Sequence, residues 1–138
     1  MAVLRKKIIV RLHDTDAAGL LFFAHQFFYA HDIYEDLLRT IGASMEDLIA
    51  NAAFFVPIVH AESQYLLGLN VGQELEASVV IANLGNSSYT LEYELKNTAG
   101  ELVGKAKTVH VTIDRSTRKK IPIPQDFRAR LSKFQSAP

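Results

Sequence analysis

The segment HDTDAAG, residues 13–19, holds the residue types and the spacing best suited to chemistry. Asp16 lies in a predicted loop, Gly19 follows three residues later, and the strongest helical pattern of the chain begins just beyond. The first turn of a helix carries unpaired backbone N–H groups and the positive end of the helix dipole, which stabilise an oxygen that becomes negative in a transition state. Here the N–H donors would come from the backbone of residues 22–24. A carboxylate held opposite them could attack a carbonyl or deprotonate an attacking water.

These groups suit a thioester better than an amide. The sequence shows no obvious Ser–His or Cys–His pair to activate a nucleophile, and it has no cysteine at all. A free thiol has a pKa near ~8.5 and departs readily as a thiolate, so one carboxylate with an oxyanion site can be enough. The residues alone do not force this function, because Asp-Thr-Asp before a helix is more often a turn and a helix cap.

A long helix is predicted soon after residues 13–19. Apolar and aromatic residues recur there at spacings of three and four, and Gly42 is a natural stop, so we expect a helix over residues 25–41. The predicted stripe consists of Phe27, Ala30, His31, Tyr34, Leu37, Leu38 and Ile41. Four phenylalanines at its start are predicted to be mostly core, with one or two beside a substrate. They are Phe22, Phe23, Phe27 and Phe28.

The rest of the chain predicts strands with short turns. Residues 5–12 indicate a first strand, and β-branched or alternating stretches follow within 55–69, 73–85, 87–100 and 101–115. Short helical segments are expected after Ser44 and after Pro124. Antiparallel strands beside one long helix favour an α+β fold, in which the helix is wrapped by a five-stranded sheet. Residues 1–138 are expected to form a single domain.

Composition narrows the class of protein. Fifteen basic residues balance fifteen acidic ones, so the bulk charge gives no pull toward nucleic acid or an anionic membrane. No apolar stretch approaches the ~18 residues that span a bilayer, and the start of the chain does not resemble a signal peptide. We therefore expect a cytoplasmic protein. Five histidines without cysteine show no close pairing, so neither a metal nor another cofactor is expected.

The sequence DTDAAG followed by LLFFAHQFFYAHDIYEDLL resembles the signature of the 4-hydroxybenzoyl-CoA thioesterase-like family of the hotdog superfamily. The resemblance extends over nearly the whole chain and implies the hotdog fold and acyl-CoA hydrolysis. It further implies that Asp16 is the catalytic carboxylate, that the N–H of Phe23 polarises the thioester carbonyl, and that Gly19 lets the loop approach the thioester. Coenzyme A would then be part of the substrate rather than a cofactor.

Three shorter segments narrow the resemblance. Residues 31–35, 56–60 and 118–122 look like the 1,4-dihydroxy-2-naphthoyl-CoA hydrolases of phylloquinone and menaquinone synthesis, although that family has Glu more often than Asp after His31. This resemblance implies 1,4-dihydroxy-2-naphthoyl-CoA as substrate. Two alternatives stay open, namely a broad short- or medium-chain thioesterase for acyl-CoA or acyl carrier protein, and a sensor that binds acyl-CoA without turnover.

Other polar residues are weaker candidates. His25 is expected to line the acyl pocket, and His60 and Ser63 to contact the substrate from a partner chain. Asp32 and Glu35 on the helix are rivals of Asp16, although an interface role suits them better. Arg118, Lys119 and Lys120 could hold the phosphates of CoA, or could be a solvated turn. An unpaired strand edge and an apolar helix face predict a homodimer, and the resemblance implies a tetramer of two dimers.

Overall fold

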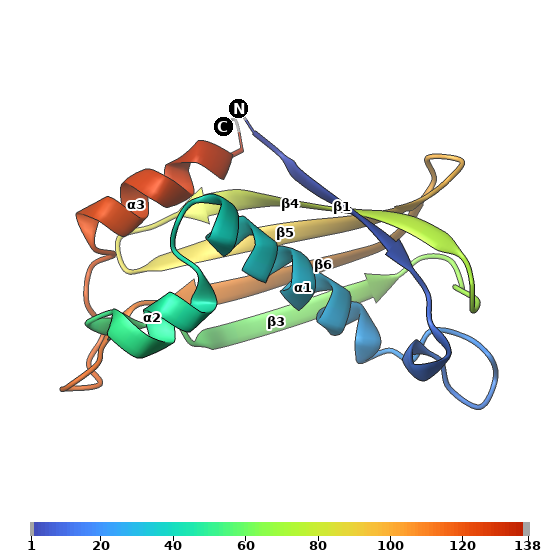
Figure 1. Cartoon of the computed structure of the whole chain (residues 1–138), viewed down its shortest axis with the longest axis horizontal. Coiled ribbons are helices and arrows are strands. Elements are labelled where there is room, and N and C mark those ends of the chain that lie inside the picture. Colours follow the sequence, from blue (N-terminus) through green and yellow to red (C-terminus); the bar gives the residue numbers. More distant parts are fainter. Residues whose placement is uncertain (1, 137–138) are drawn as a thin grey trace.

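The computed structural model of the protein describes residues 2–136, and it contains one five-stranded antiparallel sheet with the strand order β1-β4-β5-β6-β3. The strands are β1 (Leu4–Ile9), β3 (Ile58–Tyr65), β4 (Glu74–Leu84), β5 (Ser88–Asn97) and β6 (Leu102–Val111). Helix α1 (His25–Thr40) lies across one face of this sheet (Figure 1). The predicted α+β class with five antiparallel strands is confirmed. The predicted domain also includes residues 1 and 137–138, which lie outside the described residues.

The helical part of the prediction, one long central helix, needs correction. The described residues contain three α-helices: α1 has 16 residues, while α2 (Met45–Asn51) and α3 (Gln125–Leu131) have 7 each. Gly42 ends α1 because its φ of 78° is a left-handed conformation that favours glycine. Arg130 of α3 then donates to the carbonyl oxygen of Ile41 at 2.9 Å, so α3 is tied to the end of α1.

Two predicted strands are each divided in the structure. Phe54–Phe55 (β2) pairs with Ile113–Asp114 (β7) in a separate two-stranded sheet. The register of β3 against β6 shifts between Ile58 and His60, directly after Pro57, so the chain changes direction there. A proline provides no N–H for a ladder, which explains why residues 55–69 do not form one continuous strand.

The core lies between α1 and the sheet. Strands β4 and β5 bury every second residue, as expected for strands with one face against a helix. The buried face of α1 differs from the predicted stripe at its start, because His31 is exposed and Phe27 only partly buried. The residues of α1 that are buried instead are Gln26, Tyr29, Ala30, Ile33, Tyr34, Leu37 and Leu38.

The two edge strands of the sheet differ in how they are covered. Lys6 of β1 forms an ion pair with Asp36 of α1 at 2.9 Å, and basic residues blunt this edge. On β3, every residue except Ser63 is exposed, including Ile58 and Val59. The edge formed by β3 is therefore the one suited to pairing with another strand. In the part of the chain that the structure describes, no helix is long and apolar enough to cross a membrane.

Candidate active site

Asp16 lies at the exposed tip of a tight turn directly before α1. The N–H of Gly19 donates to the carbonyl oxygen of Asp16 at 3.0 Å, and the N–H of Ala18 donates to Oδ1 of Asp16 at 2.8 Å. Gly19 has φ of 77°, and a Cβ built there would meet nothing within 4 Å. Glycine is therefore favoured by backbone conformation, and the space beside it is open, as the predicted close approach of a substrate requires.

Backbone hydrogen bonds hold the two sides of this loop together. The N–H of Phe22 donates to the carbonyl oxygen of Asp14 at 2.8 Å, and the N–H of Leu21 donates to that of Leu69 at 2.8 Å. A further bridge joins Leu20 to Asn70. The turn with Asp16 is thus presented by a small hairpin that is fixed to the segment before β4.

The start of α1 offers two free backbone donors rather than the three that residues 22–24 suggested. Phe22 is excluded because its N–H is already used, whereas the N–H groups of Phe23 and Ala24 have no acceptor within residues 2–136. The N–H of His25 holds the carbonyl of Phe22 at 2.9 Å. Because a trans peptide points its C=O and N–H in opposite directions, this bond also aims the N–H of Phe23.

Tyr65 of β3 orients the next peptide group. Its hydroxyl donates to the carbonyl oxygen of Phe23 at 2.5 Å. By the same planarity, the N–H of Ala24 points away from Tyr65. The N–H of Ala24, next to the predicted oxyanion donor of Phe23, is therefore oriented by a strand residue that is 42 positions away in the sequence.

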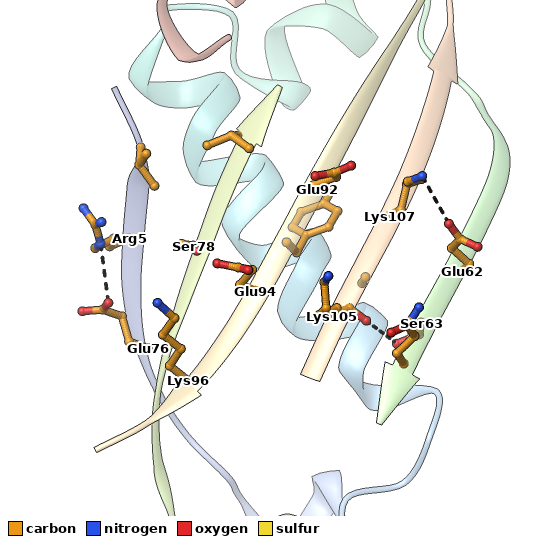
Figure 2. Close-up of a pocket in the computed structure, with 15 residues that line it drawn as sticks. Arg5, Glu62, Ser63, Glu76, Ser78, Glu92, Glu94, Lys96, Lys105 and Lys107 are labelled. Atoms are coloured by element: carbon orange, nitrogen blue, oxygen red, sulfur yellow. Dashed lines mark hydrogen bonds and ion pairs between the residues drawn. The ribbon is translucent and has the colours of Figure 1, made fainter. Parts of the chain in front are cut away.

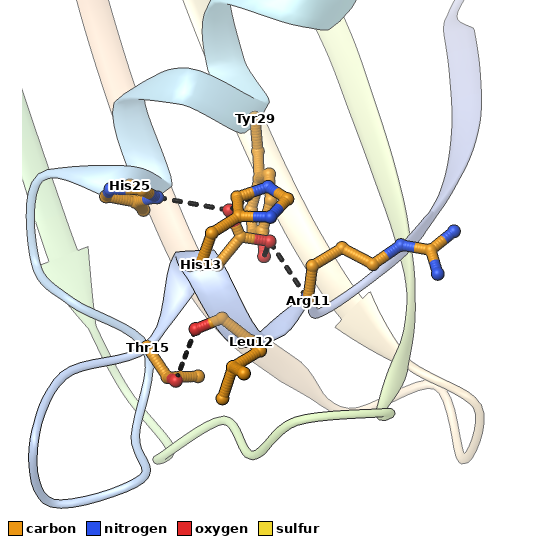
Figure 3. A network of polar contacts seen from close by, with 7 residues as sticks. Arg11, Leu12, His13, Thr15, His25 and Tyr29 are labelled. Atoms are coloured by element: carbon orange, nitrogen blue, oxygen red, sulfur yellow. Dashed lines mark hydrogen bonds and ion pairs between the residues drawn. The ribbon is translucent and has the colours of Figure 1, made fainter.

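Asp14, which the sequence did not single out, is a buried carboxylate. Its partners His25 and Tyr29 lie at the start of α1, and Arg11 lies opposite them (Figure 3). Asp14 accepts hydrogen bonds from the backbone of Arg11 at 2.9 Å, from the hydroxyl of Tyr29 at 2.8 Å and from Nδ1 of His25 at 3.1 Å. Burial raises the pKa of Asp14, but the hydrogen bonds from Arg11, His25 and Tyr29, with nearby His13, outweigh burial and bring this pKa below its usual value. His25 is thus held by a charged partner.

The phenylalanines at the helix start are mostly not core, contrary to the prediction. Phe22, Phe23 and Phe28 are 39%, 63% and 57% exposed. The ring of Phe23 lies 4.7 Å from that of Phe22, and the ring of Phe28 stacks on His25 at 4.4 Å. They form an exposed aromatic surface because the buried face of α1 begins instead with Gln26 and Tyr29. A flat aryl group could pack against this exposed aromatic surface.

Of the two strand residues predicted to contact a substrate, one is engaged within its own chain. The amide of Gln26 donates to Oγ of Ser63 at 2.6 Å and to the carbonyl oxygens of Gln64 at 3.0 Å and Lys105 at 3.1 Å. Ser63 therefore helps to fix the first turn of α1. His60 is exposed, and its Nε2 lies 3.8 Å from a carboxylate oxygen of Glu62.

The structure does not bring the basic cluster to Asp16 within one chain. The guanidinium of Arg118 lies over the ring of Phe55 at 4.9 Å, and Lys119 and Lys120 are exposed on the same turn. This turn is at the opposite end of the molecule from the Asp16 loop, beside α2 (Figure 1). With 16 residues, α1 separates the two ends by about 24 Å. Any phosphate contact at the same site would come from another copy.

The outer face of the sheet has a hollow of about 470 Å³, shown in Figure 2. Charged residues line it, including Arg5 paired with Glu76 at 3.5 Å and Lys107 paired with Glu62 at 3.5 Å. Its lining includes none of Asp16, Phe23 and His25, so it is separate from the candidate active site.

The rival carboxylates lie on the outer side of α1. Asp32 and Glu35 are both exposed, and the buried face of the helix turns away from them. Within residues 2–136, no group of three or more His, Cys, Asp or Glu side chains is arranged to hold a metal ion.

A comparison with known protein families shows the class of protein to which the chain belongs. A family model described as the thioesterase-like superfamily matches residues 10–131, a range that includes the Asp16 loop, the three α-helices and every strand of the five-stranded sheet except β1. The chain belongs to the thioesterase-like superfamily, and the predicted thioester hydrolase class is confirmed.

Individual relatives indicate a narrower subgroup of this superfamily. The chain is 34% identical over 129 residues to a 1,4-dihydroxy-2-naphthoyl-CoA hydrolase of Thermosynechococcus vestitus, covering 94% of this chain and 86% of that one. It is 36% identical over 118 residues to the protein of the same name from Nostoc punctiforme, covering 86% and 79%. The crystal structure of a 1,4-dihydroxy-2-naphthoyl-CoA thioesterase from Synechocystis matches with a TM-score of 0.88 at 27% identity, covering 95% and 96%. The predicted likeness to this subgroup is confirmed.

Proposed function

We propose that this protein hydrolyses 1,4-dihydroxy-2-naphthoyl-CoA to the free acid and coenzyme A. The observation that carries the proposal is the carboxylate of Asp16 on a fixed turn before α1, where the N–H of Phe23 is unpaired. The names of the relatives support the choice of acyl group. The exposed aromatic rings at the helix start support it independently, because a flat aryl group packs well against such rings.

In the proposed mechanism, the thioester carbonyl oxygen accepts a hydrogen bond from the N–H of Phe23. Asp16 either attacks the carbonyl carbon, forming an anhydride that water then hydrolyses, or takes a proton from an attacking water. In both cases the C–S bond breaks and coenzyme A leaves as a thiolate. The reaction uses no metal or other cofactor. Single-turnover hydrolysis in ¹⁸O-labelled water separates the two roles, since label in Asp16 contradicts a pure base role.

We further propose that the active site is completed by a second copy of the chain in a homodimer, or in a tetramer of two dimers. The exposed β3 edge supports this assembly. Two-fold antiparallel pairing of β3 places the start of one strand beside the end of the other. His60 and the turn with Arg118, Lys119 and Lys120 from one copy would then approach the Asp16 loop of its partner, where the basic side chains can meet CoA phosphates.

The proposed acyl group would place the protein in phylloquinone or menaquinone biosynthesis. We propose that the reaction takes place in the cytoplasm, and the absence of cysteine is compatible with a reducing compartment.

The central test replaces Asp16 with asparagine. The side-chain size is kept, so Asp16→Asn should fold normally while kcat for 1,4-dihydroxy-2-naphthoyl-CoA falls by roughly 10²–10⁴-fold. Glu35→Gln, a matched change on the exposed side of α1, should retain activity.

Two results would contradict the proposal. Unchanged hydrolysis by Asp16→Asn, with loss in Glu35→Gln, would move catalysis to the helix carboxylate. Weak activity of the wild type on aryl-CoA esters beside strong activity on decanoyl-CoA would support the broad thioesterase instead.

A further inference from the structure

Asp14 is a buried charge that the proposed hydrolysis does not use. The residue is only 4% exposed, and burying a carboxylate is costly unless hydrogen bonds compensate. Arg11 and Tyr29 donate to one carboxylate oxygen, and His25 donates to the other at 3.1 Å (Figure 3). Nδ1 of His25 is thus hydrogen-bonded to an anion that is itself fixed in position.

The charge of Asp14 decides the tautomer of His25. An ionised carboxylate has acceptors only, so Nδ1 of His25 must carry the hydrogen of this bond. In a neutral imidazole the other nitrogen is then an acceptor. Within residues 2–136, no side chain or backbone group donates to Nε2 of His25. His25 therefore offers a free acceptor of fixed identity.

Two aromatic rings contact the imidazole of His25. The imidazole of His25 stacks on Phe28 with 29° between the planes, and it meets Phe22 edge-on with centroids 5.9 Å apart. His25 also follows Phe23, the proposed carbonyl-binding residue, by two positions. A planar acyl group that lies against these rings would bring its own polar substituents toward Nε2.

We propose that the Asp14–His25 pair makes the site selective for aryl-CoA esters that carry a ring hydroxyl. His25 Nε2 accepts a hydrogen bond from that hydroxyl, and Asp14 is a positioning residue that holds the hydrogen of the neutral ring at Nδ1. The inference rests on the proposed function and deepens it, because it names the substrate group that is recognised. A site built to pair a hydroxyl disfavours an analogue that lacks it.

The test compares 1,4-dihydroxy-2-naphthoyl-CoA with 2-naphthoyl-CoA in wild type and in His25→Phe, which keeps a flat ring but has no acceptor. The ratio of the two kcat/KM values should fall by about tenfold in His25→Phe, as expected for one lost hydrogen bond. Comparing ratios between proteins cancels the difference in intrinsic reactivity of the two esters. His31→Phe, at an exposed histidine of the same helix, should leave the ratio unchanged.

The role of Asp14 has its own measurement. In ¹⁵N NMR spectra, His25 of the wild type should be protonated at Nδ1, whereas Asp14→Asn should shift the proton toward Nε2 and lower the same selectivity ratio. A wild-type His25 protonated at Nε2, or equal loss on both esters in His25→Phe, would overturn the inference while the proposed function stood. A wild type that hydrolyses neither ester would overturn both.

Discussion

His25 and His110 both stack on aromatic rings, yet they lie in opposite environments. The side chain of His25 is 19% exposed and has the carboxylate of Asp14 as partner. His110 is 1% exposed, stacks on Tyr89 with centroids 5.0 Å apart, and has only neutral hydrogen-bond partners. Burial lowers the pKa of His110 to about 4, so this ring is neutral inside the protein. An accessible histidine with a charged partner suits recognition, whereas an enclosed neutral one suits packing.

His110 takes part in an internal chain of hydrogen bonds, and a buried tyrosine pair lies beside it. Nε2 of His110 meets Oγ1 of Thr108 at 2.9 Å, and that oxygen also meets the hydroxyl of Tyr93 at 2.9 Å. The hydroxyls of Tyr34 and Tyr89 lie 2.6 Å apart. Among the described residues, no buried side-chain nitrogen or oxygen lacks a partner. The polar groups here are satisfied internally, while His25 keeps one nitrogen for a ligand.

The largest expected effect on stability tests whether the surroundings of His110 are packed more tightly than those of His25. Tyr89→Ala removes a fully buried ring and should lower the free energy of unfolding by about 3–5 kcal/mol in urea denaturation. Phe28→Ala removes a ring that is 57% exposed and should cost much less. Equal losses for the two variants would show that the helix start is as tightly packed as the core.

The pH dependence of stability should isolate His110. The unfolded chain binds a proton near pH 6.5, whereas the folded protein resists it until about pH 4, so stability is lost as pH falls between these values. The loss should be on the order of 3 kcal/mol. Below about pH 3.8, the lowered pKa of Asp14 adds a separate loss. His110→Gln should remove the first slope, and an unchanged slope would assign it to another group.

A smaller effect is expected where the helix start is anchored to the sheet. A Cβ on Gly104 would lie 2.5 Å from Oε1 of Gln26, whose amide is already held by three acceptors. Gly104→Ala should therefore cost about 1–3 kcal/mol of unfolding free energy. At Gly68 the nearest atom is Leu20 Cδ2 at 3.4 Å, which makes Gly68→Ala the matched control. The cost should shrink in a Gln26→Ala background; the same cost in both backgrounds would argue against this contact.

Local patterns predicted the elements well because their signals lie close together in the chain. The long helix was expected over residues 25–41 and runs over His25–Thr40, since the spacing of apolar residues and Gly42 determine its extent. The five-stranded antiparallel sheet also followed from alternation and turns. The two-residue strands did not, because they depend on how Pro57 redirects the chain.

The site was predicted less completely, because its supports come from distant segments. Asp16 stood out by its motif, but the burial of Asp14 depends on Tyr29 of α1, which lies 15 residues later in the chain. Gln26 was missed because its partners are 37 to 79 residues away. Two signals could have found it, a polar residue on the inner face of a helix and Gly104 inside a strand.

The hydroxyl of Tyr65 connects the outermost strand to the carbonyl of Phe23. In the proposed assembly, the strand that pairs two copies also orients the peptide group directly after the one that receives the thioester. Association and substrate affinity then become thermodynamically linked, and the coupling must be reciprocal. A bound ester would hold two copies together by the same factor by which pairing improves its binding, so activity per chain would depend on enzyme concentration.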